Sequence, residues 1–115
     1  MKEVKAIIKP FKLDDVKEAL KKIGIDGLTV CEAKGFGTQK GNTELYQGRE
    51  YVVEWVPKIM LVTVVPDEKV SEAVRAIVDS AKSGRVGDGR VIVTHVEQFW
   101  NIRTSRYELL RSSIT

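Results

Sequence analysis

The sequence is poor in the residues that carry most covalent and metal chemistry. Its 115 residues include one cysteine, Cys31, and one histidine, His95. A single cysteine excludes an internal disulfide and any multi-cysteine metal site, and we expect Cys31 to be a small core residue. His95 has no serine or cysteine pattern around it, so a structural or surface role is expected. No spacing of histidine, cysteine and carboxylates would hold a metal unaided.

Long apolar runs and a strong net charge are missing too. No stretch of about 18 apolar residues occurs, so we expect no membrane insertion. The segment Met1–Val4 does not begin a secretory signal, and a cytoplasmic location is expected. The net charge of +3 is too small to indicate nucleic acid as a partner, although it suits anionic ligands. The carboxylates form no catalytic constellation, so the chain is predicted to be a binding protein and no enzyme.

Two segments have the apolar spacing of helices. The first carries Leu13, Val16 and Leu20 on one face and is expected to stop at Gly24. The second opens at Pro66-Asp67, where the Asp67 side chain is expected to cap free backbone amides. Its apolar face consists of Val70, Ala73, Val74, Ile77, Val78 and Ala81.

Four strands complete the pattern and predict the fold. The order β-α-β, long loop, β-α-β is that of the α+β, ferredoxin-like βαββαβ fold, with an antiparallel four-stranded sheet and both helices on one face. We expect one domain over residues 1–104 and a polar C-terminal tail over 105–115. Because the third strand is apolar on both sides, a second copy of the chain is expected to bury the open sheet face. The expected strands are Lys2–Lys9, Leu28–Phe36, Ile59–Val65 and Arg90–Glu97.

The stretch "SGRVGDGRV", residues 83–91, is a candidate anion site. Its glycines free the backbone to turn amides toward an anion, and Lys82, Arg85 and Arg90 surround it with positive charge. Arg103 is expected to reach the same region. A plain helix-to-strand connection is the alternative. A second glycine-rich basic turn, "KGFGTQKG" at residues 34–41, ends the preceding strand, and the two turns together suggest a shared nucleotide.

The long stretch "GNTELYQGREYVVEW", residues 41–55, needs an explanation, because compact domains rarely keep connections beyond about 12–15 residues without a function. A two-residue turn at Gln47-Gly48 between short extended arms would make it a hairpin.

With these stretches in place, the sequence resembles the PII family of nitrogen-regulatory signalling proteins. The resemblance runs from "AIIKPFKLDDVKEAL" through "KGFGTQKG", "TELYQGREYVVEWVPK" and "SGRVGDGRVIV" to "IRT". It implies a homotrimer whose sheets pack inward, and a nitrogen- and energy-status signal transducer that binds ATP or ADP in the clefts between subunits. It also implies 2-oxoglutarate bound beside Mg-ATP, with the magnesium ligated by Gln39.

The resemblance also assigns site residues. Lys9, Gln39, Lys58 and Gly87 would bind 2-oxoglutarate. The nucleotide residues would be Ile7, Thr29, Gly35, Phe36, Gly37, Thr38, Gln39, Lys40, Val64, Gly87, Asp88, Gly89, Arg90, Asn101 and Arg103.

The loop over residues 37–55 corresponds to the mobile T-loop through which the family touches its targets. By resemblance the target is an enzyme, a regulator or an ammonium channel. Ordering such a polar segment costs roughly 1–2 kcal/mol per residue, so a ligand at its root can shift its conformations. Tyr51 matches the tyrosine that nucleotidyltransferases modify in many relatives, an ordinary loop tyrosine being the alternative.

Departures from the family pattern at four positions bear on function. Thr38 and Asn101 stand where basic residues are usual. Since charge-assisted hydrogen bonds are worth about 1.5–3 kcal/mol each, we expect a reduced preference for ATP over ADP and tolerance of AMP. Gln47 replaces an arginine that helps to block ammonium channels, which places that activity in question. Arg49 replaces a serine that some relatives phosphorylate.

Two other classes share the element order. An RRM-like nucleic-acid-binding module would stack bases on aromatics of its central strands, but Ile59–Val65 contains none. An acylphosphatase-type enzyme would need an arginine–asparagine catalytic pair, and the sequence offers no clear one.

Overall fold

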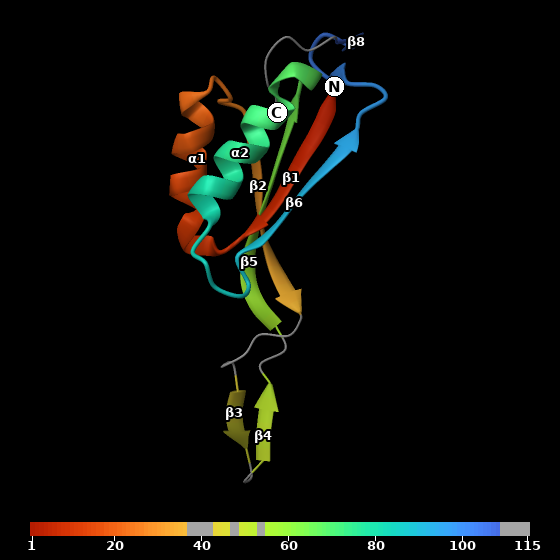
Figure 1. Cartoon of the computed structure of the whole chain (residues 1–115). Helices are drawn as coiled ribbons and strands as arrows, with labels where there is room; N and C mark the ends of the chain where they lie inside the picture. Colours follow the sequence, from red (N-terminus) through yellow and green to blue (C-terminus); the bar gives the residue numbers. More distant parts are fainter. Residues whose placement is uncertain (37–42, 47–48, 53–54, 109–115) are drawn as a thin grey trace.

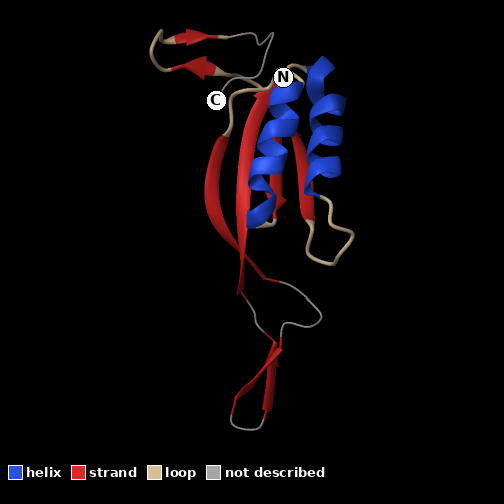
Figure 2. Cartoon of the chain, turned by 90° about the vertical axis from the view of Figure 1, so that its left-hand side faces the viewer, coloured by secondary structure: helices blue, strands red, loops and turns tan. Residues whose placement is uncertain are grey.

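A computed structural model describes residues 1–36, 43–46, 49–52 and 55–108. Its main sheet has the order β2-β5-β1-β6, and every neighbouring pair is antiparallel. Both helices, α1 (Leu13–Lys22) and α2 (Val70–Ala81), cover one face of this sheet (Figures 1 and 2). The expected ferredoxin-like fold is thereby confirmed. The four strands are β1 (Lys2–Ile8), β2 (Thr29–Phe36), β5 (Trp55–Val65) and β6 (Gly89–His95).

Each helix follows a short 3-10 turn, at Pro10–Lys12 before α1 and at Asp67–Lys69 before α2. The expected stop of α1 is confirmed, since Gly24 takes a φ of +87° and donates its amide to the Lys21 carbonyl at 3.0 Å. The expected cap of α2 is wrong. Asp67 makes no capping bond, because its carboxylate accepts a 2.8 Å bond from the N-terminal ammonium of Met1.

The core lies between the helices and the sheet face that they cover. Alternation along β1 and β5 sends every second side chain toward the helices, and the helix residues that meet them follow the expected apolar faces. The buried apolar residues are Val4, Ala6, Ile8, Val16, Leu20, Ile25, Leu61, Val65, Ala73, Ile77 and Ala81.

The opposite, open face of the sheet is largely aliphatic and uncovered within one chain. Strand register places Ile7 beside Met60, and Val62 between Lys5 and Thr29, on this face. Cys31 pairs with Met60 and is exposed, so the expectation that it lies in the core is wrong for the single chain. Alternation along β2 turns its side chain away from the helices.

The strand that follows the long connection begins earlier than the sequence indicated. β5 begins at Trp55 rather than Ile59, so Trp55 belongs to the sheet and not to the loop. Phe36 pairs with Trp55 across β2 and β5, and their ring centroids lie 5.6 Å apart. Cross-strand aromatic contact of this kind stabilises the extra ladder.

The long connection contains a two-stranded hairpin, as the sequence allowed. β3 (Thr43–Tyr46) pairs with β4 (Arg49–Val52), and Tyr46 stands opposite Arg49. Figure 1 draws this hairpin beyond the ends of β2 and β5. The proposed turn residues Gln47 and Gly48 lie outside the described residues.

A second hairpin, which the sequence analysis missed, follows β6. β7 (Trp100–Asn101) pairs with β8 (Arg106–Tyr107). The Asn101 Oδ1 accepts a 3.1 Å bond from the Thr104 amide, and the Trp100 and Tyr107 rings meet edge to face with centroids 6.0 Å apart. The expected tail at 105–115 therefore begins inside a paired turn. No helix in the described part of the chain is long and apolar enough to cross a membrane.

Candidate functional site

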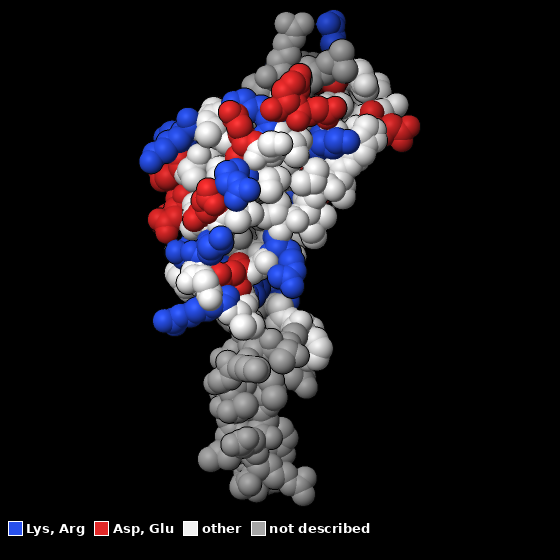
Figure 3. Space-filling model, in the orientation of Figure 1, with Lys and Arg blue, Asp and Glu red and all other residues white. Residues whose placement is uncertain are grey.

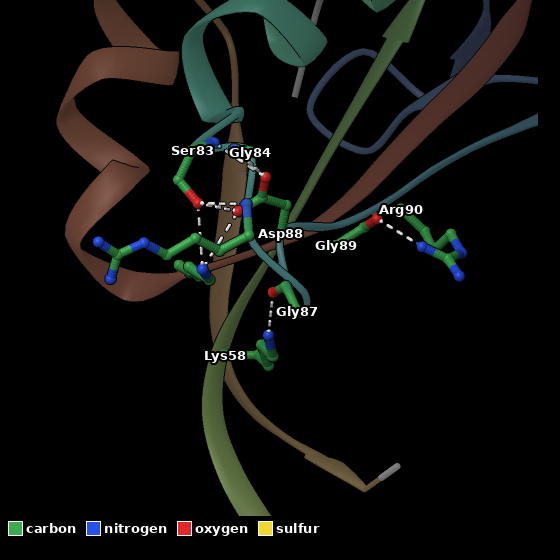
Figure 4. Close-up of polar contacts among 9 residues, drawn as sticks. Lys58, Ser83, Gly84, Gly87, Asp88, Gly89 and Arg90 are labelled. Atoms are coloured by element: carbon green, nitrogen blue, oxygen red, sulfur yellow. Dashed lines mark hydrogen bonds and ion pairs between the residues drawn. The ribbon is translucent and has the colours of Figure 1, made fainter. Parts of the chain in front are cut away.

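The glycine loop, residues 83–89, joins α2 to β6 and is built around the Asp88 carboxylate. The Ser83 and Gly84 amides each donate to Asp88 Oδ2 at 2.9 Å, and the Ser83 hydroxyl donates to Oδ1 (Figure 4). Lys9, at the end of β1, places its Nζ 3.1 Å from the same Oδ1. The Ser83 hydroxyl, then its amide, and the Lys9 ammonium all favour the ionised acid, so the pKa of Asp88 lies well below its usual range.

Gly89 sets how closely this loop approaches the sheet. It has a φ of +117°, and a Cβ at this position would lie 1.8 Å from the Ile7 carbonyl oxygen. Only glycine tolerates both conditions. The backbone that enters β6 is consequently pressed against β1, and Arg90 pairs with Ile7.

Lys58 links the loop to β5. Its Nζ donates a 2.6 Å bond to the Gly87 carbonyl (Figure 4), and the residue is only 7% exposed. Burial, followed by the nearby charge of Lys9, lowers the pKa of Lys58, while Asp88 opposes that change. A buried ammonium with a single protein acceptor among the described residues is well suited to bind an anion.

Two hollows border this region. One, of about 360 Å³, is lined by both lysines together with Pro10, Phe11, Val56 and Pro57. The other, of about 400 Å³, lies on the helix side between α2 and β6 and ends at Lys82, Asp88 and Arg90. Both have the size of small-ligand sites. Figure 3 shows lysine and arginine side chains gathered at this lower end of the described body.

The structure brings most of the predicted site residues together at one end of the sheet. Gly35 packs against the Lys58 side chain, since a Cβ added there would lie 3.2 Å from the Lys58 Cγ. We call this group the loop-end set. It comprises Ile7, Lys9, Gly35, Phe36, Lys58, Gly87, Asp88, Gly89 and Arg90.

Three predicted nucleotide residues lie at the other end of the sheet, and we call them the hairpin-end set: Val64, Asn101 and Arg103. Thr29 stands opposite Val62, near the middle of the sheet. Val64 is four residues along β5 from Met60, the partner of Ile7, or about 13 Å away. β6 runs from the glycine loop up to the hairpin that carries Asn101 and the exposed Arg103 (Figure 1). Within one chain, Arg103 therefore does not reach the glycine loop as expected.

The remaining predicted residues cannot be placed. Gly37, Thr38, Gln39 and Lys40 lie outside the described residues, and of Tyr51 only its backbone position in β4 is described. Among the residues that the structure describes, no three histidine, cysteine or carboxylate side chains are grouped to hold a metal ion.

Ser83 is the site residue that sequence reasoning overlooked. Its hydroxyl is within hydrogen-bond distance of Lys9 Nζ at 3.2 Å and of the Arg85 amide at 3.3 Å, besides donating to Asp88. The sequence pattern that could have suggested this contact is a serine followed five residues later by an aspartate, with glycines between them.

Comparison with known proteins identifies the family of the chain. The family model described as nitrogen regulatory protein P-II matches residues 1–106. The chain belongs to the nitrogen regulatory protein P-II family. Among curated relatives with that name, those of Azospirillum brasilense and Rhodobacter capsulatus are 58% identical to it and that of Haemophilus influenzae 55%. Each comparison spans 104 residues, 90% of this chain and 93% of the relative.

Membership in the P-II family makes this chain a nitrogen regulatory protein, a regulator and no enzyme. The aliphatic open face of β1 and β5 also differs from the aromatic platform that an RRM-like module would need.

Proposed function

We propose that the chain is a cytoplasmic signal transducer of nitrogen and energy status. It binds ATP or ADP together with 2-oxoglutarate at sites between subunits of a homotrimer. Through the T-loop, residues 37–55, it regulates a target enzyme, regulator or ammonium channel. The observation that carries the proposal is the separation of the loop-end set from the hairpin-end set, which lie at opposite ends of the sheet.

This division favours a site shared by two copies. The glycine loop and the hairpin lie at the two ends of β6, whose seven residues span about 20 Å. A nucleotide bound within one chain would have to cover this whole length, whereas the loop-end set of one copy can face the hairpin-end set of the next. The open aliphatic face supports the same assembly, because Ile7, Met60 and Val62 leave apolar surface that a neighbouring sheet would remove from water.

The loop-end set fits the anionic parts of the proposed ligands. Gly84, Gly87 and Gly89 all take positive φ, a backbone conformation that lets successive loop amides turn toward phosphate oxygens. Lys58 and Lys9 border one hollow, and their ammonium groups suit the two carboxylates of 2-oxoglutarate. These protein groups would bind and orient the ligands.

Magnesium enters the proposal through the ligands. Gln39 would be the protein ligand of the metal, whose charge would offset that of the phosphate and carboxylate groups. Because magnesium usually keeps few protein ligands beside substrate phosphates, a single amide oxygen is a sufficient contribution.

Calorimetric titration tests the proposal. Wild-type protein is titrated with ATP, ADP and 2-oxoglutarate, the last with and without Mg-ATP, and its mass is measured by analytical ultracentrifugation. We expect a trimer that binds both nucleotides and binds 2-oxoglutarate only when Mg-ATP is present. A monomer that binds none of these compounds would overturn the proposal.

Modification of Tyr51 by a nucleotidyltransferase is a separate part of the proposal. Incubation with a nucleotidyltransferase that modifies P-II proteins should add one nucleotidyl mass per chain, and Tyr51→Phe should abolish the addition. An unchanged intact mass of the wild type would exclude this role for the enzyme tested.

A further inference from the structure

The Ser83 hydroxyl occupies the centre of the glycine-loop network. Within hydrogen-bond reach it has an acid, Asp88, an ammonium, Lys9, and a loop amide, that of Arg85. These partners come from three places in the chain: the end of β1, the beginning of the loop and its end. Ser83 therefore connects the two ends of the loop to each other and to the end of β1.

Asp88 poses an electrostatic difficulty for any phosphate bound here. It stands between Gly87 and Gly89 in the segment expected to hold phosphates, and a carboxylate turned toward a phosphate would repel it. In the structure the carboxylate points back into the loop, where the Ser83 and Gly84 amides, the Ser83 hydroxyl and Lys9 surround it (Figure 4).

We propose that Ser83 is a positioning residue for the phosphate site. Its hydroxyl holds the Asp88 carboxylate and the Lys9 ammonium together, which keeps the acid turned inward and leaves the backbone of Gly87, Gly89 and Arg90 to face an anion. The inference rests on the proposed function, because it concerns nucleotide binding at the same loop. Ser83 itself touches no ligand in this account.

Ligand binding by three variants tests the inference. Ser83→Ala removes the hydroxyl, Ser83→Thr keeps it, and Ser71→Ala makes the same deletion at an exposed position of α2. ATP and AMP are titrated calorimetrically into each. We expect Ser83→Ala to weaken ATP binding about five- to tenfold and AMP binding less. Ser83→Thr and Ser71→Ala should bind like wild type. Unchanged ATP binding in Ser83→Ala, or an equal loss in Ser83→Thr, would overturn the inference.

A second measurement needs no ligand. In Ser83→Ala the Asp88 carboxyl should titrate closer to its ordinary range by NMR, and the amides of residues 83 and 84 should exchange with solvent at least about tenfold faster. Ser83→Thr should restore both values. Unchanged titration and exchange in Ser83→Ala would overturn this connecting role. If the wild type ignores ATP, the proposed function fails, whereas a wild type that binds ATP beside an unaffected Ser83→Ala defeats this inference alone.

Discussion

Lys58 Nζ donates a 2.6 Å hydrogen bond to the Gly87 carbonyl and so ties strand β5 to the glycine loop. The lysine expected to bind 2-oxoglutarate thus already holds the loop expected to bind phosphate. A dicarboxylate that takes up this ammonium must compete with a backbone carbonyl, so ligand entry and loop position are linked at one bond.

Replacing Lys58 by methionine tests its part in binding. Lys58→Met keeps a similar apolar stem and removes the ammonium, so 2-oxoglutarate affinity in the presence of Mg-ATP should fall at least about tenfold, the loss of one charged hydrogen bond. Lys17→Met, an exposed change on α1, is the matched control and should bind normally. Calorimetry makes the measurement, and full 2-oxoglutarate affinity in Lys58→Met would contradict the assignment.

Gly89→Ala should be among the most damaging single changes in the loop. The added Cβ would meet the Ile7 carbonyl oxygen at 1.8 Å in a backbone with a φ of +117°, so we expect a loss of about 3 kcal/mol or more in the free energy of unfolding. Gly84→Ala is the control, since its φ of +82° carries strain but no atom lies within 4 Å of the added carbon. It should cost about 1–2 kcal/mol. Urea denaturation would compare the two, and equal losses would refute the steric argument.

Acid should destabilise the protein through two carboxyls. Folding lowers the pKa of Asp88 through Ser83, and that of Asp67 through its hydrogen bond to the N-terminal ammonium, below the ordinary 3.8. Below about pH 5 the unfolded chain therefore binds more protons than the folded one, and the stabilisation present above that range is lost as the pH falls.

Urea midpoints measured between pH 7 and pH 3 check this prediction. Asp88→Asn and Asp67→Asn should each flatten the profile, whereas Asp79→Asn, at an exposed position of α2, should follow the wild type. If the urea midpoints of Asp88→Asn and Asp67→Asn fall with pH as steeply as that of the wild type, other groups cause the loss of stability.

Restoring positive charge should sharpen nucleotide selectivity. Asn101→Arg and Thr38→Arg each place a guanidinium at a position where the resemblance to the PII family implies a basic residue. We expect the double variant to raise the ratio of ATP to ADP affinity about tenfold or more, because each charged hydrogen bond is worth about 1.5–3 kcal/mol. Competitive titration would measure the ratio. If the wild type already prefers ATP strongly, the expectation of weak discrimination is wrong.

A charge on the open sheet face should break the proposed trimer. Val62→Glu places a carboxylate between Lys5 and Thr29 on that face, where burial against another copy would be costly. Sedimentation should show monomers with native circular dichroism, while Ser71→Glu on the covering helix leaves the assembly intact. A trimeric Val62→Glu protein would place the interface elsewhere.

Local patterns were enough to predict the architecture. The spacing of Val16 and Leu20, the stop at Gly24 and the apolar run after Ile59 each correspond to an observed element. Non-local pairings were harder to anticipate. The strand from Trp55 depends on its contact with Phe36, and Asp67 binds the chain terminus 66 positions earlier in preference to its own helix. A local pattern contains neither partner.

The candidate site was predictable as a set of residues and less so as an arrangement. Glycines 87 and 89 and Lys58 were named, and the structure brings them together. The hydrogen bonds of Ser83 were not predicted, because a serine in the sequence does not indicate which carboxylate its hydroxyl will contact in the fold. Cys31 was predicted to lie in the core because free cysteines are usually buried. Its position in β2 instead places it on the uncovered face of the sheet.

Because the loop-end and hairpin-end sets lie far apart within one chain, ligand binding should depend on the concentration of the protein. If a pocket is complete only where two chains meet, every bound adenylate also stabilises the contact between those chains. By mass action, the apparent affinity for the nucleotide then falls when the protein is diluted. At a low protein concentration the same sequence would then respond only to higher concentrations of its ligands.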